Sequence, residues 1–144
     1  MRLLVSACLL GAGCRYDGRN NVLPQLVRLM DRYTCVPVCP EQLGGLPTPR
    51  MPAERKGDRV VDREGKDVTA AFRRGAEESA RLARILGCKA ALLKERSPSC
   101  GCGMIYDGTF TGTLKVGDGV AAEVLKAHGI PVYGESRIGE LLDL

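Results

Sequence analysis

Four short apolar runs, separated by segments with helical spacing, limit most strongly how this chain can fold. They occupy residues 3–7, 35–39, 89–94 and 130–133. Short apolar runs that end in Gly, Pro or Cys-containing loops are typical of strands buried on both faces of a parallel sheet. Alternation of strands and helices then predicts one α/β domain over residues 1–144. We expect an open, mainly parallel sheet of about four strands with helices on both faces, in a Rossmann-like arrangement.

The segments between these runs predict the covering elements. Apolar residues recur at helical spacing in three stretches and again at the C-terminus, where Ile138, Leu141 and Leu142 share one face. The three stretches are residues 22–30, 70–86 and 119–128. Residues 60–62 and 66–68 flank a Gly-containing turn and predict a small hairpin outside the main sheet. Residues 40–52 hold four prolines and two glycines, which predicts a loop without a regular element.

Composition excludes several classes of protein. A chain of 144 residues with 44% hydrophobic content can bury a core, which excludes general disorder. The net charge of +4 is spread along the chain and only 4% of residues are aromatic, so binding of nucleic acid is not indicated. No apolar run reaches the roughly 20 residues that span a bilayer. We expect a cytoplasmic protein without a membrane partner, and the sequence leaves a homodimer open.

The N-terminus contains a motif that could be mistaken for a lipid-attachment signal. Val5-Ser6-Ala7 before Cys8 has the composition of such a signal, but the apolar stretch that precedes the cysteine is only five residues long. Secretory signals have an apolar region of roughly 7–15 residues. The segment is therefore interpreted as a buried first strand.

Three of the seven cysteines end a predicted strand or lie in the loop that follows one. These are Cys8, Cys39 and Cys100. In open α/β sheets, ligands bind beyond the carboxyl ends of the strands. If the three strands are neighbours, the three thiols converge on one rim of the sheet.

Thiolates at such a rim favour a soft metal centre. They suit zinc, copper(I) and iron–sulfur clusters, but the chain lacks the two Cys-x-x-Cys pairs common in structural zinc sites. A cubane cluster is wide enough to collect ligands from separate loops, and three ligands would leave one iron open to a substrate. The alternative is that the thiols only pack in the core.

The remaining cysteines divide into two groups. Cys35 and Cys88 lie at the beginning of predicted strands, opposite the rim, and are expected to pack in the interior. Cys14 and Cys102 lie in loops at the rim itself. Either could be a fourth ligand, a resolving thiol or a bystander.

Polar residues at the same rim could move protons or hold a substrate. A carboxylate in a dehydrated cleft can act as a general acid or base, which makes Glu41 a catalytic candidate, although it could also brace the loop. Ser97 and Ser99 flank Pro98 just before the third cysteine, and a serine hydroxyl can orient water or hold a substrate oxygen. Arg15 and Arg50 add positive charge and are candidates for substrate binding.

Seven segments of the chain together resemble one bacterial family, which includes the thiouracil desulfidases. The resemblance covers essentially the whole chain, and its motifs agree in content and order. They are Ser-Ala-Cys-Leu-Leu-Gly at 6–11, Cys-Arg-Tyr-Asp-Gly at 14–18, Val-Cys-Pro-Glu at 38–41, Gly-Leu-Pro-Thr-Pro-Arg at 45–50, Asp-Val-Thr at 67–69, Ser-Pro-Ser-Cys-Gly at 97–101 and Tyr-Asp-Gly-Thr-Phe at 106–110.

This resemblance implies a cofactor and a reaction. A [4Fe-4S] cluster would be bound by Cys8, Cys39 and Cys100, with Ser97 and Glu41 as catalytic residues. The implied reaction is the non-redox desulfuration of a small thiolated pyrimidine such as 2-thiouracil, which gives uracil and hydrogen sulfide. The alternative is a protein without turnover: a sulfide carrier, or a metal- or redox-binding protein.

Overall fold

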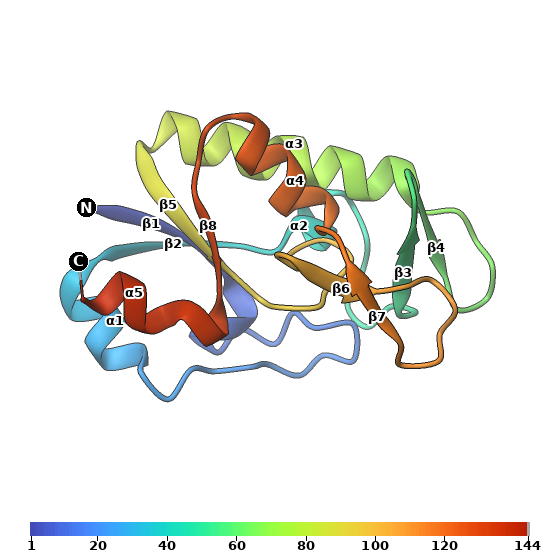
Figure 1. The fold of residues 1–144 in the computed structure, drawn as a ribbon, viewed down its shortest axis with the longest axis horizontal. Helices are drawn as coiled ribbons and strands as arrows, with labels where there is room; N and C mark the ends of the chain where they lie inside the picture. The colour runs from blue at the N-terminus through green and yellow to red at the C-terminus, as the bar shows by residue number, and fades with distance from the viewer. Residues whose placement is uncertain (144) are drawn as a thin grey trace.

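The centre of the molecule is a parallel sheet with the strand order β2–β1–β5–β8 (Figure 1). The computed structural model describes residues 1–143, and in this part of the chain the sheet has four strands. Every neighbouring pair in it is parallel, which confirms the expected open parallel sheet. The strands are β1 (Arg2–Ser6), β2 (Thr34–Val38), β5 (Cys88–Leu93) and β8 (Val132–Gly134).

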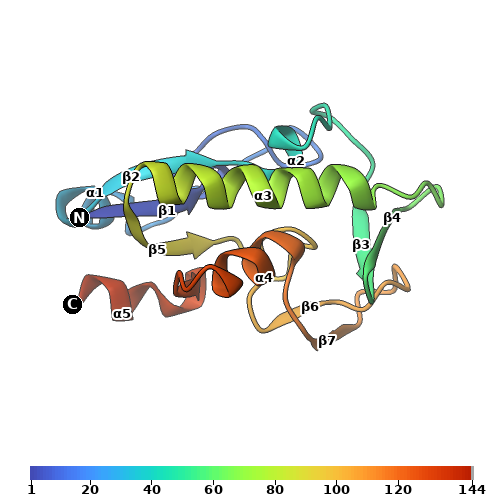
Figure 2. The same cartoon turned by 90° about the horizontal axis from the view of Figure 1, so that it is seen from above.

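Helices cover both faces of this sheet, as the sequence predicts (Figure 2). Side chains alternate along β5, so that Leu93 packs with α3 and α4 on one face and Leu92 packs with α1 and α5 on the other. Because both faces are buried, the strands contain almost continuous apolar runs. The helices are α1 (Leu26–Arg32), α3 (Thr69–Ile85), α4 (Val120–Ala127) and α5 (Ile138–Leu142).

Two antiparallel hairpins lie beyond the carboxyl ends of the main strands within residues 1–143 (Figure 2). One pairs β3 (Ala53–Lys56) with β4 (Arg59–Asp62), and the other pairs β6 (Met104–Tyr106) with β7 (Leu114–Val116). The sequence analysis was wrong about the partner of β4 and did not predict the β6–β7 pair. A two-residue turn at Gly57, with φ of 59°, joins β4 to β3, and residues 66–68 contact β4 only through the bridge between Val61 and Asp67.

The proline-rich segment contains a regular element that the sequence analysis did not predict. Pro40–Leu43 forms the one-turn helix α2, because proline is well suited to the first turn, where its missing N–H has no intrahelical partner. Helix α2 packs backbone to backbone on α3. A Cβ atom added at Gly75 would lie 1.7 Å from the carbonyl oxygen of Pro40, and one added at Gly44 would lie 1.9 Å from that of Ala71. The two glycines therefore allow the close approach of α2 and α3.

The part of the chain that the structure describes also contains two short 3₁₀ helices: η1 (Ala7–Leu10), directly after β1, and η2 (Glu135–Arg137), directly after β8. Among residues 1–143, no helix combines the length and the apolar character needed to cross a membrane.

Candidate active site

A cavity of about 520 Å³ opens at the carboxyl ends of the central strands. Its walls come from the loops after β1, β2 and β5 and from the two hairpins. The eight site residues predicted from the sequence all line this cavity. They are Cys8, Arg15, Cys39, Glu41, Arg50, Ser97, Ser99 and Cys100.

The fold brings three distant cysteines to this cavity. Cys8 lies in η1 immediately after β1, Cys39 separates β2 from α2, and Cys100 lies in the loop that follows β5. These strands are neighbours in the sheet, with β1 in the middle. The expected convergence of thiols at one rim is therefore present.

The thiols sit close enough to influence one another's ionisation. Burial raises the pKa of Cys100 to about 12, and a further increase comes from the nearby Cys8. Burial also raises the pKa of Cys8, with an added contribution from Cys39, while a hydrogen bond with Asn21 opposes the shift. Without a bound cation these groups resist ionisation, and a metal centre would favour their thiolate forms.

The spacing of the donors argues against a single metal ion. In the described part of the chain, no three His, Cys, Asp or Glu side chains are arranged to hold one ion. The thiols instead lie around a cavity and come from separate loops. Thiolate donors spread in this way fit an iron–sulfur cluster, which is several ångströms wide, better than a mononuclear zinc site.

The other cysteines differ in their relation to the cavity. Cys14 lines it, and its carbonyl oxygen accepts the S–H of Cys39 at 3.7 Å. Cys102 faces away, since its thiol donates to the carbonyl of Val132 at 3.5 Å and its side chain packs against the core below α3 and α4. Cys88 is the first residue of β5 and so lies at the amino ends of the strands, opposite the cavity, as the sequence predicts.

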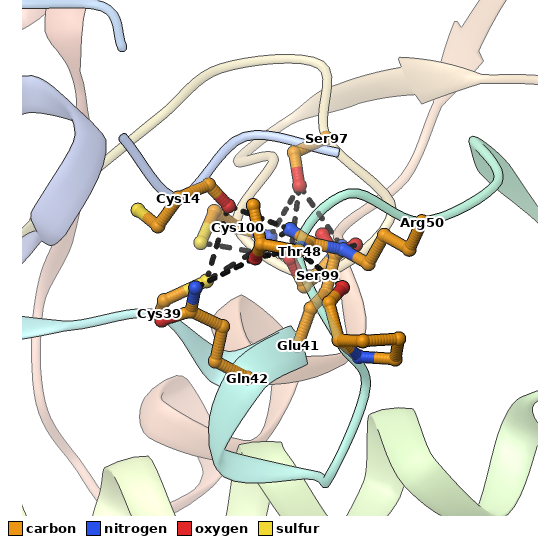
Figure 3. Close-up of polar contacts among 10 residues, drawn as sticks. Cys14, Cys39, Glu41, Gln42, Thr48, Arg50, Ser97, Ser99 and Cys100 are labelled. Atoms are coloured by element: carbon orange, nitrogen blue, oxygen red, sulfur yellow. Dashed lines mark hydrogen bonds and ion pairs between the residues drawn. The ribbon is translucent and has the colours of Figure 1, made fainter. Parts of the chain in front are cut away.

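A chain of hydrogen bonds links Glu41 to the serine motif (Figure 3). Ser99 is 2% exposed, and its hydroxyl donates to Oε2 of Glu41 at 2.8 Å. The hydroxyl of Ser97 lies 2.9 Å from that of Ser99. Oγ of Ser97 also accepts the backbone N–H groups of Ser99 and Cys100, both at 3.1 Å. The order Glu41–Ser99–Ser97 makes Ser99 the connecting group.

The two predicted arginines have carboxylate partners. Arg15 donates to Asp17 at 3.1 Å and to the side-chain oxygen of Asn21 at 3.0 Å. Arg50 forms a buried ion pair with Glu41, with Nε 2.9 Å from Oε1. Substrate binding by either arginine remains a prediction.

The mouth of the cavity contains residues that the sequence analysis did not select. Tyr106 and Phe110 come from the β6–β7 hairpin and its loop, and Glu54 and Arg63 come from the segments around the β3–β4 hairpin. The carboxylate of Glu54 accepts the backbone N–H of Phe110 at 3.0 Å, and the guanidinium of Arg63 lies 5.9 Å from the centre of the Phe110 ring. The Tyr-Asp-Gly-Thr-Phe motif was the available signal, but a turn motif does not reveal which surface the turn contacts.

Comparison with known proteins agrees with this geometry. The family described as 2-thiouracil desulfurase matches residues 3–137. The chain belongs to the 2-thiouracil desulfurase family. The family match thus extends from β1 to η2 and includes every segment that lines the cavity.

Two relatives of this 2-thiouracil desulfurase family member cover nearly all of the chain. The solved structure of the [4Fe-4S]-dependent thiouracil desulfidase TudS superposes with a TM-score of 0.92 at 48% sequence identity, and covers 97% of this chain and 94% of that one. The uncharacterized protein YbbK of Bacillus subtilis (strain 168) is 40% identical over 150 residues, which include 97% of this chain and 99% of YbbK. The similarity therefore concerns the whole domain.

Proposed function

We propose that this protein removes sulfur from small thiolated pyrimidines such as 2-thiouracil, using a [4Fe-4S] cluster. Water replaces sulfur at the thiocarbonyl carbon, so that one thiouracil and one water give one uracil and one hydrogen sulfide. The carbon–sulfur bonds break and carbon–oxygen bonds form without any net oxidation or reduction. Membership of the 2-thiouracil desulfurase family and the similarity to TudS support this reaction.

In this proposal Cys8, Cys39 and Cys100 hold the cluster. Their thiols line one cavity and come from three adjacent strand ends, in an arrangement that does not suit a single ion. When bound, the cluster supplies a Lewis-acidic iron that is open to a soft sulfur ligand and polarises the thiocarbonyl.

We propose that Glu41 is the proton acceptor, and the directions of the hydrogen bonds support this role. As a carboxylate paired with Arg50, Glu41 can only accept, so the hydrogen of Ser99 points toward it. Ser99 has one hydroxyl hydrogen, and therefore the hydrogen between the two serines belongs to Ser97. A proton released at Ser97 can pass through Ser99 to Glu41. The same path returns a proton to the departing sulfur.

Ser97 is also placed to tolerate negative charge. Two backbone N–H groups point at its oxygen, in the same manner as donors in an oxyanion hole. They stabilise Oγ while its proton is shared with Ser99. In the resting chain the hydroxyl hydrogen and both acceptor positions of Ser97 are in use, so we propose that Oγ takes a proton from the attacking water only after its own proton has moved to Ser99.

The observation that carries the proposal is that Ser99 contacts both the proposed proton acceptor and a proposed cluster ligand. Its hydroxyl donates to Glu41 and also lies 3.7 Å from the sulfur of Cys100. The proposed proton path thus runs directly beside a proposed cluster ligand. The sulfur atom of a substrate and a water molecule could then bind side by side in the same cavity of about 520 Å³.

Anaerobic turnover tests the proposal. Protein reconstituted with iron and sulfide should contain about four irons per chain, and should convert 2-thiouracil repeatedly to uracil and hydrogen sulfide, measured by chromatography and a sulfide assay. A fully loaded protein that makes no uracil would refute the reaction. Binding of one sulfide per cluster without conversion of thiouracil would instead identify a sulfide carrier.

A further inference from the structure

The guanidinium of Arg50 is the most fully engaged polar group at the site (Figure 3). Its side chain is only 6% exposed. Besides the ion pair with Glu41, Nη1 donates to the carbonyl of Pro47 at 3.3 Å and to Oγ1 of Thr48 at 2.9 Å. Nη2 donates to the carbonyl of Cys14 at 2.8 Å and approaches the sulfur of Cys39 at 3.9 Å. Each of the five N–H groups of the guanidinium therefore has an acceptor in the protein.

This set of acceptors joins the two chemical halves of the site. Glu41 belongs to the proposed proton path, and Cys39 is a proposed cluster ligand; they lie at the start of α2, while Cys14 belongs to the loop after η1. A planar guanidinium presents its donors in a fixed fork, which a lysine cannot reproduce. Burying a cation is costly in free energy, and among the partners that offset this cost for Arg50 are a proposed catalytic carboxylate and a proposed cluster ligand.

We infer that Arg50 is a positioning residue, which holds the carboxylate of Glu41 and the sulfur of Cys39 in a fixed relation. This inference rests on the proposed function. It assigns to Arg50 a role different from the substrate contact predicted from the sequence, because its donors already serve protein acceptors. Hydrogen bonds to ligand sulfurs are one of the means by which proteins tune iron–sulfur clusters, so the Nη2 contact should also affect the cluster itself.

The test compares Arg50→Lys with Arg55→Lys in anaerobically reconstituted protein. Arg55 is an equally buried arginine outside the cavity: its side chain is 7% exposed, pairs with Glu123 at 3.1 Å and donates to two backbone carbonyls. Arg55→Lys should lower thermal stability and leave kcat, KM and the cluster spectrum unchanged. Arg50→Lys should lower kcat about 10²-fold, the scale for a displacement of about 1 Å at a reacting group. Its KM should change less than about threefold, and the visible absorption and reduction potential of the bound cluster should shift.

A milder variant covers the case in which Arg50→Lys does not fold. Thr48→Val removes one acceptor of Nη1, which Gln42 also uses. It should lower kcat relative to the wild-type protein, with little change in KM, and unchanged kcat in a folded, fully loaded variant would count against the inference.

Two results would overturn the inference. A rise in KM with unchanged kcat would show that Arg50 binds substrate, and a loss of stability alone, as in Arg55→Lys, would show a purely structural role. The proposed function fails separately if loaded wild-type protein releases no hydrogen sulfide. In that event a cluster spectrum and potential unaffected by Arg50→Lys would still refute the positioning of Cys39.

Discussion

Replacing Glu41 by Gln tests the proton path most directly. The carboxylate accepts hydrogen bonds from Nε of Arg50 at 2.9 Å and from Oγ of Ser99 at 2.8 Å. In Glu41→Gln the amide oxygen can still accept from Arg50, but the amide nitrogen then donates to Ser99. The hydrogen of Ser99 must then turn away from residue 41, toward Ser97 or the sulfur of Cys100. The substitution therefore removes the proton acceptor and reverses the hydrogen-bond chain while it preserves the shape of the side chain.

Glu41→Gln should affect turnover more strongly than stability. A hydrogen bond to a charged group contributes about 1.5–3 kcal/mol and a neutral one about 0.5–1.5 kcal/mol, so two weakened bonds cost roughly 2 kcal/mol. In a domain of this size that loss lowers the Tm of the cluster-free protein by about 4–8 °C. Loss of a general acid–base group lowers turnover about 10²–10⁴-fold, which corresponds to about 3–5 kcal/mol of barrier.

The assay is hydrogen sulfide release from 2-thiouracil, normalised to the iron content of each preparation. Glu123→Gln is the matched control, because Glu123 also pairs with a buried arginine but lies outside the cavity. It should retain wild-type turnover. If Glu41→Gln with a full complement of iron also retained wild-type turnover, Glu41 would serve only as a brace for Arg50, and the proton path through Ser99 would be refuted.

Three further predictions concern the cluster, the packing of α2 and pH. Alanine at any of the three proposed ligands should abolish the brown chromophore after reconstitution. Cys88→Ala, at the amino end of β5, should keep it. A chromophore that survives Cys100→Ala would contradict the assignment of the ligands. Gly75→Ala should cost about 1–3 kcal/mol in urea unfolding and lower turnover, because its Cβ would displace α2. Gly139→Ala, in α5 with open space around it, should raise stability by up to about 1 kcal/mol and leave turnover unchanged. Since burial raises the pKa of Cys100 to about 12, the unfolded chain loses this proton at a lower pH than the folded one. The free energy of unfolding of cluster-free protein should therefore fall as the pH rises from about 9 toward about 12, and less steeply in Cys100→Ala; equal slopes in urea titrations would exclude this contribution.

The sequence was most informative about the sheet and the thiols. Apolar runs indicate buried parallel strands because both faces of such strands must be apolar, and the strand-end rule then places Cys8, Cys39 and Cys100 at one rim. The rule works because it depends on local patterns and on one general property of open sheets. It needs no knowledge of which side chains touch.

The parts that escaped prediction depend on contacts between segments that are distant in sequence. The helix at Pro40–Leu43 is stabilised by its close approach to Gly75, which no local pattern in residues 40–52 reveals. The order Glu41–Ser99–Ser97 could not be inferred from spacing, because two serines that flank one proline are equivalent until their partners are known. The hydrogen bond from Arg50 to the carbonyl of Cys14 also joins segments that are distant in sequence, so it could not be predicted from local patterns.

The placement of three thiols beyond the ends of three adjacent strands has a consequence for maturation of the protein. No short peptide of this chain contains the complete set of proposed ligands, since Cys8, Cys39 and Cys100 meet only after β1, β2 and β5 have paired. Small zinc domains fold around their metal, but here the hydrophobic sheet supplies the folding energy before any cofactor arrives. Cluster insertion is then a late event on an already folded apoprotein. Loss of the cluster in air should consequently inactivate the protein without unfolding it, and the same molecules should be open to repair by renewed delivery of iron and sulfide.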